Sequence, residues 1–501
     1  MYDAEGIHYR GRDLFDSLGD TENHGTGSSG IIGGQAPGRR FAGMAPGVEF
    51  FEIDRTDADI EEGILLSKNM GTDIMLYEFA SWVFEFLDGS SNLEVLVSDL
   101  YDEGIHQFTA SGNLAGPARK KHARFEISRS EQDSLYFTVS ESGITQVYIS
   151  LLWKQTFLSP TITLTSPDSR SITINGDKRE HPLGDLVIIS GKDISPKQTN
   201  RMDIIVKSET PFSGDFAFSL QNRRALAITI DSYIADNITQ WMNGTQFQNH
   251  VTDDGTVCTP GTTEKDVTVG AYDPRGTRNT KGDINDFSSW GLTTDGRRAL
   301  DITAPGTLVY SLTSHQAVGG HPGGYIDFGG TSAALPHVAG CAALIVQASP
   351  GISPEELANA LYDGALVDEF TGQVPNPIWG YGKIRVYDSL VRSGIITSVN
   401  SSRAVLPTLF SVSTASPNPF NSRTSFSLSF RDVGNDPIII SVYNILGQKQ
   451  YAQTIDLLQP GTTIFSWNGI STDGEKVSSG VYLFHFRYGD TAVTRRALYL
   501  K

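Results

Sequence analysis

The sequence predicts an α/β domain that is interrupted by an all-β block and followed by a second all-β domain. Short strands and helices alternate in residues 1–118 and again after about residue 234, whereas helical patterning is missing from 123 to 230. Alternating strands and helices are typical of a sheet covered by helices, and strands alone are typical of a sandwich. The strand-only pattern returns after about residue 417.

The alternating pattern defines the α/β domain in two parts, residues 1–118 and 234–395. Its expected strands are 48–53, 73–79, 267–271 and 300–303, and its expected helices are 59–70, 93–104 and 340–348. One more helix should begin at Pro354, because Ser353 and Glu356 have the spacing of a capping box and proline suits the first helical position.

Residues 119–233 form the interrupting block. Its strand candidates are 125–127, 136–139, 147–153, 161–164, 172–174, 186–189, 202–206 and 216–220. Turn sequences such as SPDS (166–169) and NGD (175–177) separate the strands. Short strands without helices predict an inserted β-sandwich of the jelly-roll kind.

The last part of the chain is expected to be a linker followed by a β domain. Residues 396–415 carry Ser, Thr, Val and Pro without a period, which is typical of a linker. Residues 416–501 hold strand candidates at 425–430, 438–443, 463–467 and 481–488. These strands predict a β-sandwich at the C-terminus.

Composition limits the possible partners. The formal charge of −18 argues against nucleic acid and anionic membranes as partners. No run of about 18 uncharged apolar residues is present, so no membrane span is expected. Met1 is followed at once by Asp3 and Glu5, so a signal peptide is absent and the chain looks truncated. Two cysteines, Cys258 and Cys341, make neither a disulfide framework nor a metal site, and their pairing stays open.

Ser332 stands in a run of small residues, GGTSAA, just before an apolar helix candidate. A nucleophile needs an accessible hydroxyl, small neighbours and a nearby partial positive charge, and a glycine-preceded helix N-terminus supplies all three. An ordinary capping serine is the alternative. His337 is unsuited as its base, because five residues along a helix rotate it by about 140°. We expect it to be packed and hydrogen-bonded instead.

His24 is the better candidate for a general base. It is followed by Gly25, Thr26 and soon by SSG (28–30), a helix start whose small residues let another segment approach closely. Of the ten histidines in the chain, it alone has this setting.

Several segments together resemble the subtilisin-like serine proteases. GTSAALPHVAG (330–340) closely resembles the nucleophile motif of that family, NHGT (23–26) with Gly30 its histidine motif, and ASGN (110–113) the segment with its oxyanion asparagine. Further similar segments are GMAPG (43–47), DFSSWG (286–291) and DITAPG (301–306), and the chain order also agrees. The resemblance covers residues 1–118 and 235–395 and implies a parallel sheet with helices on both faces.

The resemblance implies a serine endopeptidase that acts on proteins or peptides. Ser332 would attack the scissile carbonyl, and His24 would take its proton and later deliver it to the leaving amine. Asn113 would donate its side-chain amide to the developing oxyanion. Asp3 would orient the histidine, although Gly6 follows it one residue later than in the family pattern. Asp20 fits a structural position better.

The resemblance also implies where a peptide would bind. It would add as a strand beside Glu78 and Ala80, where the family usually has Ser-Leu-Gly, and beside Ala110, Ser111 and Gly112. We expect Glu78 to favour basic side chains in the pocket, and a solvated edge glutamate is the alternative.

No cofactor is required for this chemistry. Many relatives bind structural calcium, but acidic turns such as those with Asp283 and Asp286 do not assign a site, because they equally fit solvated turns.

Two accessory resemblances concern the β domains. LTSPD (164–168) looks like a turn of the jelly-roll modules that accompany some large subtilases. The tail resembles the immunoglobulin-like C-terminal sorting domains of type IX secretion, through SPNPFN (416–421), VYNILG (442–447), WNG (467–469), GVY (480–482) and the terminal Lys501. This implies export by the type IX secretion machinery and a secreted or cell-surface protein.

Two other functions remain open from the sequence. One is an inactive, degenerate subtilase scaffold that acts as a surface-binding or adhesion protein, which the missing first strand favours. The other is hydrolysis of small esters, which the same residues could perform.

Overall fold

A computed structural model of the chain describes residues 24–34, 42–53, 60–140, 142–154, 159–223, 226–239, 241–313, 324–392, 394, 410–430, 437–455, 461–488 and 491–501. The chain divides into two units, Met1–Thr397 and Ser398–Lys501. The first unit holds the α/β sheet and the inserted β strands, and the second holds the C-terminal strands.

A parallel sheet lies at the centre of the first unit. Its strands run in the order β1 (Ile74–Tyr77), β2 (His106–Ala110), β14 (Val267–Tyr272) and β15 (Ile302–Pro305). All neighbouring pairs among them are parallel. Every residue of β2 is buried, as expected for a strand in the middle of a sheet with both faces covered.

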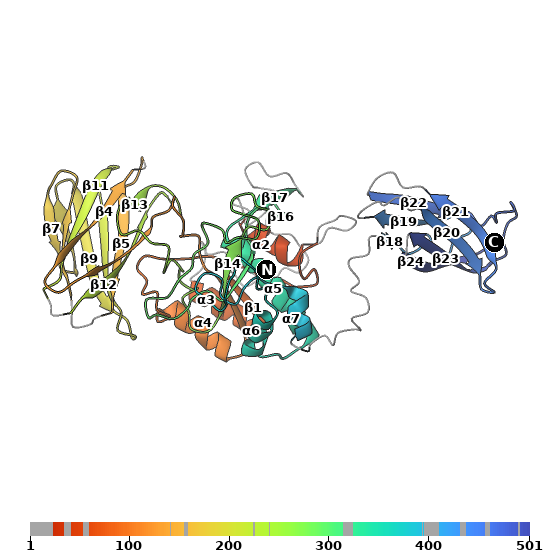
Figure 1. Cartoon of the computed structure of the whole chain (residues 1–501), viewed down its shortest axis with the longest axis horizontal. Helices are drawn as coiled ribbons and strands as arrows, with labels where there is room; N and C mark the ends of the chain where they lie inside the picture. Colours follow the sequence, from red (N-terminus) through yellow and green to blue (C-terminus); the bar gives the residue numbers. More distant parts are fainter. Residues whose placement is uncertain are drawn as a thin grey trace. The chain divides into compact units, whose positions relative to one another are not determined.

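Helices cover both faces of this sheet. On β1, Ile74 and Leu76 join the core that includes α5 (Thr331–Ala348), α6 (Pro354–Asp363) and α7 (Val386–Arg392). Met75 and Tyr77 instead pack with α3 (Ile60–Asn69) and α4 (Asn92–Asp102). Successive side chains of a strand point to opposite faces, so the two groups of helices lie on opposite sides, as predicted. Figure 1 shows α3 and α4, in orange, on one side of β1 and α5 and α7, in blue-green, on the other.

The helix starts follow local chemistry. The predicted capping box of Ser353 and Glu356 is present at the start of α6, and α4 begins with another, made by Ser91 and Glu94. α5 starts at Thr331, well before the predicted 340–348. It is long and apolar enough to cross a membrane, but 67% of it is buried inside the fold, where it forms the central core helix.

The predicted strand at 48–53 is wrong. This segment has no regular structure. Val48 and Phe50 pack instead against Gly33, the last residue of α2 (His24–Gly33), where a side chain on the glycine would collide with them. The apolar residues that suggested a strand therefore serve to hold α2.

The chain between β2 and β14 forms two antiparallel sheets. Their orders are β3-β12-β5-β10-β9-β8 and β13-β4-β11-β6-β7. The bounds are β3 (His122–Ile127), β4 (Gln132–Val139), β5 (Gln146–Trp153), β6 (Thr161–Thr165), β7 (Ser171–Ile174), β8 (Asp177–Leu183), β9 (Leu186–Ile194), β10 (Asn200–Lys207), β11 (Gly214–Gln221), β12 (Ile228–Asp236) and β13 (Thr245–Phe247). Side chains from both sheets share one core, in which Phe137 stacks on Phe216. The insert is thus a two-sheet β region, below called the sandwich.

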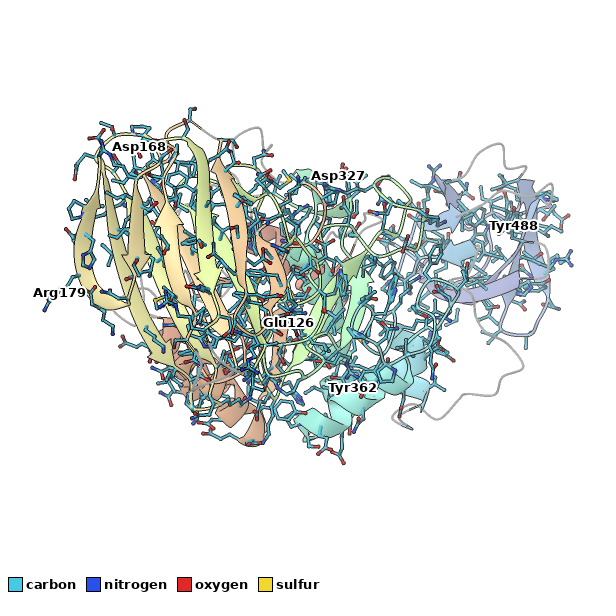
Figure 2. The ribbon with its side chains drawn as sticks, turned by 60° about the vertical axis from the view of Figure 1, so that its left-hand side comes forward. Glu126, Asp168, Arg179, Asp327, Tyr362 and Tyr488 are labelled. Carbon is cyan, nitrogen blue, oxygen red and sulfur yellow. The ribbon has the colours of Figure 1, made fainter. Side chains whose placement is uncertain are left out.

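Three strands of the sandwich were not predicted. β12 and β13 extend it beyond residue 230, and β8 begins in the predicted NGD turn. β8 reads DKREHPL and its side chains are mostly exposed, so it has no apolar alternation to signal a strand. Charged side chains are typical of an edge strand, where they oppose pairing with other chains. Figure 2 shows Arg179 of β8 on the outer side of the sandwich, far from its core.

The sandwich begins and ends at the same place. Its first strand, β3, pairs with β12 in an antiparallel register that joins His122 to Tyr233. Phe247 of the last strand, β13, in turn donates its N–H to Lys120 O, just before β3, at 3.0 Å, so the chain leaves the α/β domain and returns to it at neighbouring positions.

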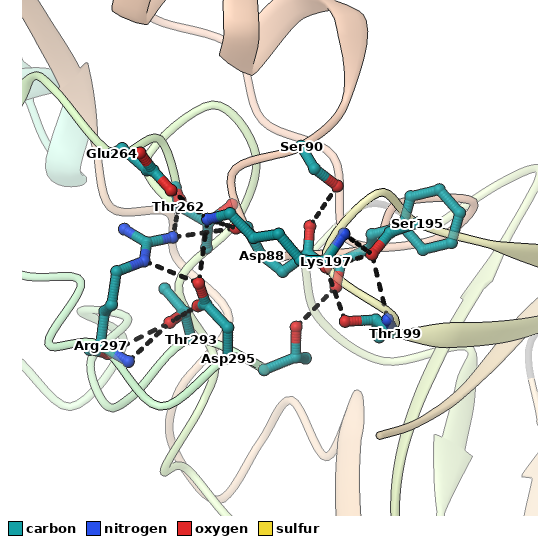
Figure 3. A network of polar contacts seen from close by, with 12 residues as sticks. Asp88, Ser90, Ser195, Lys197, Thr199, Thr262, Glu264, Thr293, Asp295 and Arg297 are labelled. Atoms are coloured by element: carbon teal, nitrogen blue, oxygen red, sulfur yellow. Dashed lines mark hydrogen bonds and ion pairs between the residues drawn. The ribbon is translucent and has the colours of Figure 1, made fainter. Parts of the chain in front are cut away.

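A polar network joins the sandwich to the α/β domain (Figure 3). At its centre is Asp88, which is fully buried. Its Oδ2 accepts hydrogen bonds from Ser195 Oγ and Thr199 Oγ1 of the sandwich, both at 2.6 Å. Lys197 Nζ bridges Asp88 O at 2.5 Å and Asp295 Oδ2 at 3.0 Å. The two parts are thus held by hydrogen bonds to buried charge, which are among the stronger kind.

Replacing Asp88 with alanine is expected to lower the free energy of unfolding by about 3 kcal/mol, because it leaves buried hydroxyls without their acceptor. Urea denaturation measures the effect. Asp185→Ala, at an exposed position of the same sandwich, is the control and should change stability by about 0.5 kcal/mol or less. Equal stability of the two variants would contradict a structural role for the network.

The second unit contains two small antiparallel sheets. One has the order β18-β19-β22 and the other β21-β20-β23-β24. The bounds are β18 (Phe410–Val412), β19 (Thr424–Phe430), β20 (Ile438–Asn444), β21 (Lys449–Ile455), β22 (Gly461–Trp467), β23 (Gly480–Tyr488) and β24 (Thr491–Tyr499). Their side chains form one core around Trp467, against which Phe420 and Phe484 pack edge-on. β16 (Val309–Leu312) and β17 (Tyr325–Phe328) form a further pair in the first unit.

Candidate active site

The candidate residues gather at the carboxyl edge of the parallel sheet. Glu78 follows the end of β1, and Asn113 follows the end of β2. The start of α5 is held at the same edge, because Gly330 N–H donates to Gly306 O just after β15, at 2.9 Å. Ligand sites of open α/β sheets lie at this edge.

Asn113 is fixed against the start of α5. Its Oδ1 accepts hydrogen bonds from Thr331 N at 2.9 Å and from Thr331 Oγ1 at 3.2 Å. Because a backbone N–H can only donate, the oxygen of the amide must face Thr331. Nδ2, the other terminal atom of the Asn113 amide, has no hydrogen-bond partner in the part of the chain that the structure describes. The sequence did not reveal Thr331 as the anchor, although the threonine precedes the serine in the GTS motif.

Ser332 lies in the first turn of α5 and is 8% exposed. Its own N–H is one of the donors that a helix start leaves unpaired, and its Oγ makes no hydrogen bond among the described residues. Gly330 has φ of 101°, a value that favours glycine, and a Cβ there would stand 3.3 Å from Asn113 Nδ2. The glycine at position 330 thus leaves room for the Asn113 side chain at the start of α5.

His24 is the first residue of α2, which packs against α5. Its ring meets Phe328 edge-on, with 5.6 Å between ring centroids. Phe328 in turn packs with Ile31 of α2 and Ala333 of α5 in one small core. A Cβ on Gly27 would come within 2.9 Å of Phe328, so the predicted small residues do allow close packing. His24 and Ser332 thus flank the same cluster.

His337 is packed and hydrogen-bonded, as predicted. Its Nδ1 lies 2.8 Å from Ala333 O, one turn back on the helix, and donates to it. Burial lowers the pKa of His337, and the Ala333 carbonyl partly opposes this effect. It is therefore a neutral core histidine.

Glu78 does not lie on a solvated edge. Its side chain is 16% exposed and faces the start of α2, where Oε2 lies 3.4 Å from His24 Nδ1 and accepts a hydrogen bond from Ser28 Oγ. Burial raises its pKa from 4.5 to about 8, although the Ser28 hydroxyl lowers it and repulsion from Glu52 raises it further. The sequence did not signal this contact, because the two residues belong to segments that only the fold brings together.

The segment from Ala110 to Gly112 is already bonded within the fold. Ser111 N–H donates to Val269 O at 3.0 Å, Ser111 O accepts from Cys258 N at 3.1 Å, and Gly112 O accepts from Ser289 N at 3.0 Å. The Ser111 N–H is thus already used within the fold, and strand addition along Ser111 and Gly112 stays a prediction. Ala80 packs beside Trp82 in a separate cluster, and its pairing with peptide stays a prediction.

The remaining residues that the sequence singled out are the two aspartates near the N-terminus, the two cysteines and the acidic turns. Asp3 and Asp20 lie outside the described residues. Cys258 and Cys341 are both buried and free, so they do not pair. Among the described residues, no group of three or more His, Cys, Asp or Glu side chains is placed to hold a metal ion. Asp286 Oδ1 instead lies 3.2 Å from Arg278 Nε.

Buried carboxyl groups should make stability fall as pH rises. Burial raises the pKa of Glu78 and of Glu85 to about 8 and that of Asp301 to about 6. Such groups bind protons more tightly in the folded state, so their contribution is complete below the unfolded pKa and is lost as pH rises through the folded pKa. We expect the free energy of unfolding to drop by several kcal/mol between about pH 5 and about pH 9.

Carboxylates whose pKa is lowered in the folded state do not cancel this trend. Against the effect of burial, backbone N–H groups lower the pKa of Asp273 to about 2, so its contribution is lost only in strong acid. Urea denaturation across this pH range measures the slope, and a stability that rises with pH would contradict the prediction.

Comparison with known proteins finds relatives among the proteases. Residues 219–382 match the model of the subtilase family, peptidase S8. The serine protease AprX of Bacillus subtilis (strain 168) is 36% identical over 153 residues, which are 28% of this chain and 32% of AprX. Alkaline elastase YaB of Bacillus sp. (strain YaB) is 38% identical over 112 residues, 22% of this chain and 24% of that protein. The matched part thus spans a third or less of these relatives.

A solved structure extends the likeness to the fold. The CspB protease of Clostridium perfringens matches with a TM-score of 0.62 and 19% identity, over 77% of this chain and 85% of that chain. The first unit therefore has a subtilisin-like protease fold with additional all-β sheets.

Proposed function

We propose that the protein is a secreted serine endopeptidase in which Ser332 is the nucleophile, His24 the general base and Asn113 an oxyanion donor. The observation that carries the proposal is the anchoring of Asn113 Oδ1 by Thr331 N, which leaves Nδ2 beside the start of α5. Asn113 Nδ2 and the backbone N–H of Ser332 are then two hydrogen-bond donors for one oxyanion at the start of α5. An asparagine that only capped the helix would use Oδ1 in the same way, so the role of Nδ2 is what the Asn113 variants test.

The chemistry follows from these positions. Ser332 Oγ attacks the peptide carbonyl, and its proton passes to His24 Nε2. Asn113 Nδ2 and the N–H of Ser332 stabilise the negative charge that develops on the carbonyl oxygen. His24 then gives its proton to the leaving amine, and water hydrolyses the acyl-enzyme by the same steps. No cofactor takes part.

A fluorophosphonate probe tests this proposal, because it labels only an activated serine. We expect the native protein to be labelled at a single peptide, which mass spectrometry maps to Ser332, and the heat-denatured protein to remain unlabelled. Labelling should fall when a peptide substrate competes. Native protein that stays unlabelled at every pH from about 5 to about 10 would favour the scaffold alternative, in which the domain only binds surfaces.

We further propose that the second unit is an immunoglobulin-like sorting domain that directs export through type IX secretion. The SPNPFN segment supports this, since its Phe420 packs against Tyr499 near the end of the chain, with 5.0 Å between ring centroids. In a bacterium with this secretion system, the full chain placed behind a secretory signal peptide should reach the cell surface. A chain without residues 491–501, which form β24 and the C-terminus, should stay in the periplasm; its normal export would contradict the assignment.

A further inference from the structure

The contact between Glu78 and His24 suggests a role for this glutamate that differs from the pocket role expected from its position in the sequence. Oε2 of Glu78 lies 3.4 Å from Nδ1 of His24 and also accepts the hydrogen bond of Ser28 Oγ. Ser28 is one helical turn after His24, so both face the glutamate from the same side of α2. The carboxyl group therefore lies against the face of the helix that carries the histidine.

The second oxygen of Glu78 does not hold the side chain in place. Oε1 is buried and has no hydrogen-bond partner within the described residues. A buried polar atom without a partner is costly, so Oε1 does not account for the position of this carboxyl group. Among the described residues, the polar contacts of Glu78 run through Oε2, the atom that faces His24.

We propose that Glu78 is a positioning residue for His24, whose Nδ1 proton Glu78 Oε2 accepts so that the lone pair of Nε2 faces Ser332. The inference rests on the proposed function, since it assigns a role within that reaction. The distance of 3.4 Å is long for a hydrogen bond, and such bonds in free enzymes often tighten when substrate binds.

The proton balance fixes which form of Glu78 is active. When Ser332 loses its proton to Nε2, His24 becomes an imidazolium, and the Glu78 carboxylate accepts the Nδ1 hydrogen and stabilises the positive charge. The proton on Nε2 then passes to the leaving amine, and the carboxylate is unchanged. A protonated Glu78 would instead donate to Nδ1, which forces the ring proton onto Nε2 and blocks it as a base.

The surroundings of Glu78 set the pH range of this step. The groups that face it are His24 and Ser28 of α2 and Glu52 of the segment before α3. Burial and the Glu52 charge keep the pKa of Glu78 near 8, so the carboxylate becomes dominant only in mild alkali. Activity that depends on the carboxylate should rise with pH through this value.

The test compares kcat and KM of the full chain over about pH 5 to about pH 10. Glu78→Gln should lower kcat at about pH 9 by about 10²-fold or more, because the amide cannot hold the imidazolium, while KM changes by less than about threefold. The rise of activity near pH 8 should vanish in this variant. If the KM of Glu78→Gln rises while kcat is retained, Glu78 contacts the substrate and the inference is overturned. The inference is also overturned if the kcat of this variant and its pH profile match those of the wild type.

Glu85→Gln is the matched control. Burial raises the pKa of Glu85 to about 8 as well, but its charged neighbours are Glu94, Arg201 and Asp203 rather than His24. This variant should keep the kcat and pH profile of the wild type. An equal loss in both variants would mean that any buried carboxyl in this region supports the fold, and it would overturn the assignment.

A second variant keeps the carboxyl group and shifts its titration. Ser28→Ala removes the hydroxyl that favours the ionised form of Glu78, so the rise of activity should move to higher pH. An unmoved profile would overturn the inference even if Glu78→Gln failed to fold.

Two further measurements separate the role of Glu78 from the proposed function as a whole and from a role of Asp3. Fluorophosphonate labelling of the wild type at Ser332 reports on the proposed function alone, so labelled wild type with an unaffected Glu78→Gln variant rejects only the role of Glu78. Asp3→Asn, alone and combined with Glu78→Gln, shows which carboxylate orients the histidine. A loss in Asp3→Asn with none in Glu78→Gln would assign the role to Asp3 and overturn the inference.

Discussion

Replacing Ser332 with alanine is expected to lower kcat for peptide hydrolysis by roughly 10⁶-fold, because a nucleophile and its base act as a unit and either loss disables both. The variant should fold normally, since Ser332 Oγ makes no hydrogen bond among the described residues and alanine suits a helix. Substrate binding should persist, because the pocket and Asn113 are unchanged. Steady-state hydrolysis of a chromogenic peptide, with active-site titration of the wild type, measures the loss.

Ser98→Ala is the matched control for this change. Ser98 also lies on a helix, α4, and its buried Oγ has no partner in the described part of the chain. This variant should retain the activity of the wild type. If Ser332→Ala kept more than about 1% of wild-type kcat, the nucleophile would lie elsewhere and the proposed function would fail.

Asn113→Ala is expected to lower kcat by about 10²–10³-fold with little change in KM, because the lost donor acts on charge that develops only in the transition state. The same change removes the acceptor of Thr331 N–H, which lies at the start of α5. A helix start that loses its capping acceptor is destabilised by about 1 kcal/mol. Catalysis should therefore suffer more than stability.

Asn113→Asp separates these two effects. The aspartate keeps an acceptor for Thr331 but offers no amide donor, and its negative charge would repel the oxyanion. We expect a loss of kcat at least as large as in the alanine variant and a melting temperature near that of the wild type, measured by circular dichroism. Comparable kcat for Asn113→Asp and the wild type would show that Asn113 only caps α5.

The sequence predicted that Ser332 and its small neighbours stand at a helix N-terminus, although the helix candidate at 340–348 was too short, because that information is local. Gly330 needs its unusual φ, and Ser332 follows directly in the same turn, so adjacent residues carry the whole signal. The capping box of Ser353 and Glu356 was readable for the same reason. The two-sided cover of the sheet was implied by the family resemblance.

Features that depend on tertiary contacts were not readable in this way. The strand candidate at 48–53 has apolar residues, but they pack against α2 instead of pairing in a sheet. β8 carries charged residues because it is an edge strand, so period-two alternation could not reveal it. Glu78 looked like part of the pocket wall, because nothing in its own segment states that His24 lies beside it.

The meeting of the two ends of the sandwich has a consequence for how the protein assembles during synthesis. Thr109 of β2 and Thr268 of β14 hydrogen-bond at 3.1 Å although 159 residues separate them. A ribosome must deliver the whole sandwich before the second of these strands emerges. Pairing of β3 with β12 brings the two ends of the sandwich together. The loop that must still close to place β14 beside β2 is then much shorter than the whole sandwich, so its closure costs less entropy. The paired ends of the insert thus hold the two halves of the parallel sheet close together.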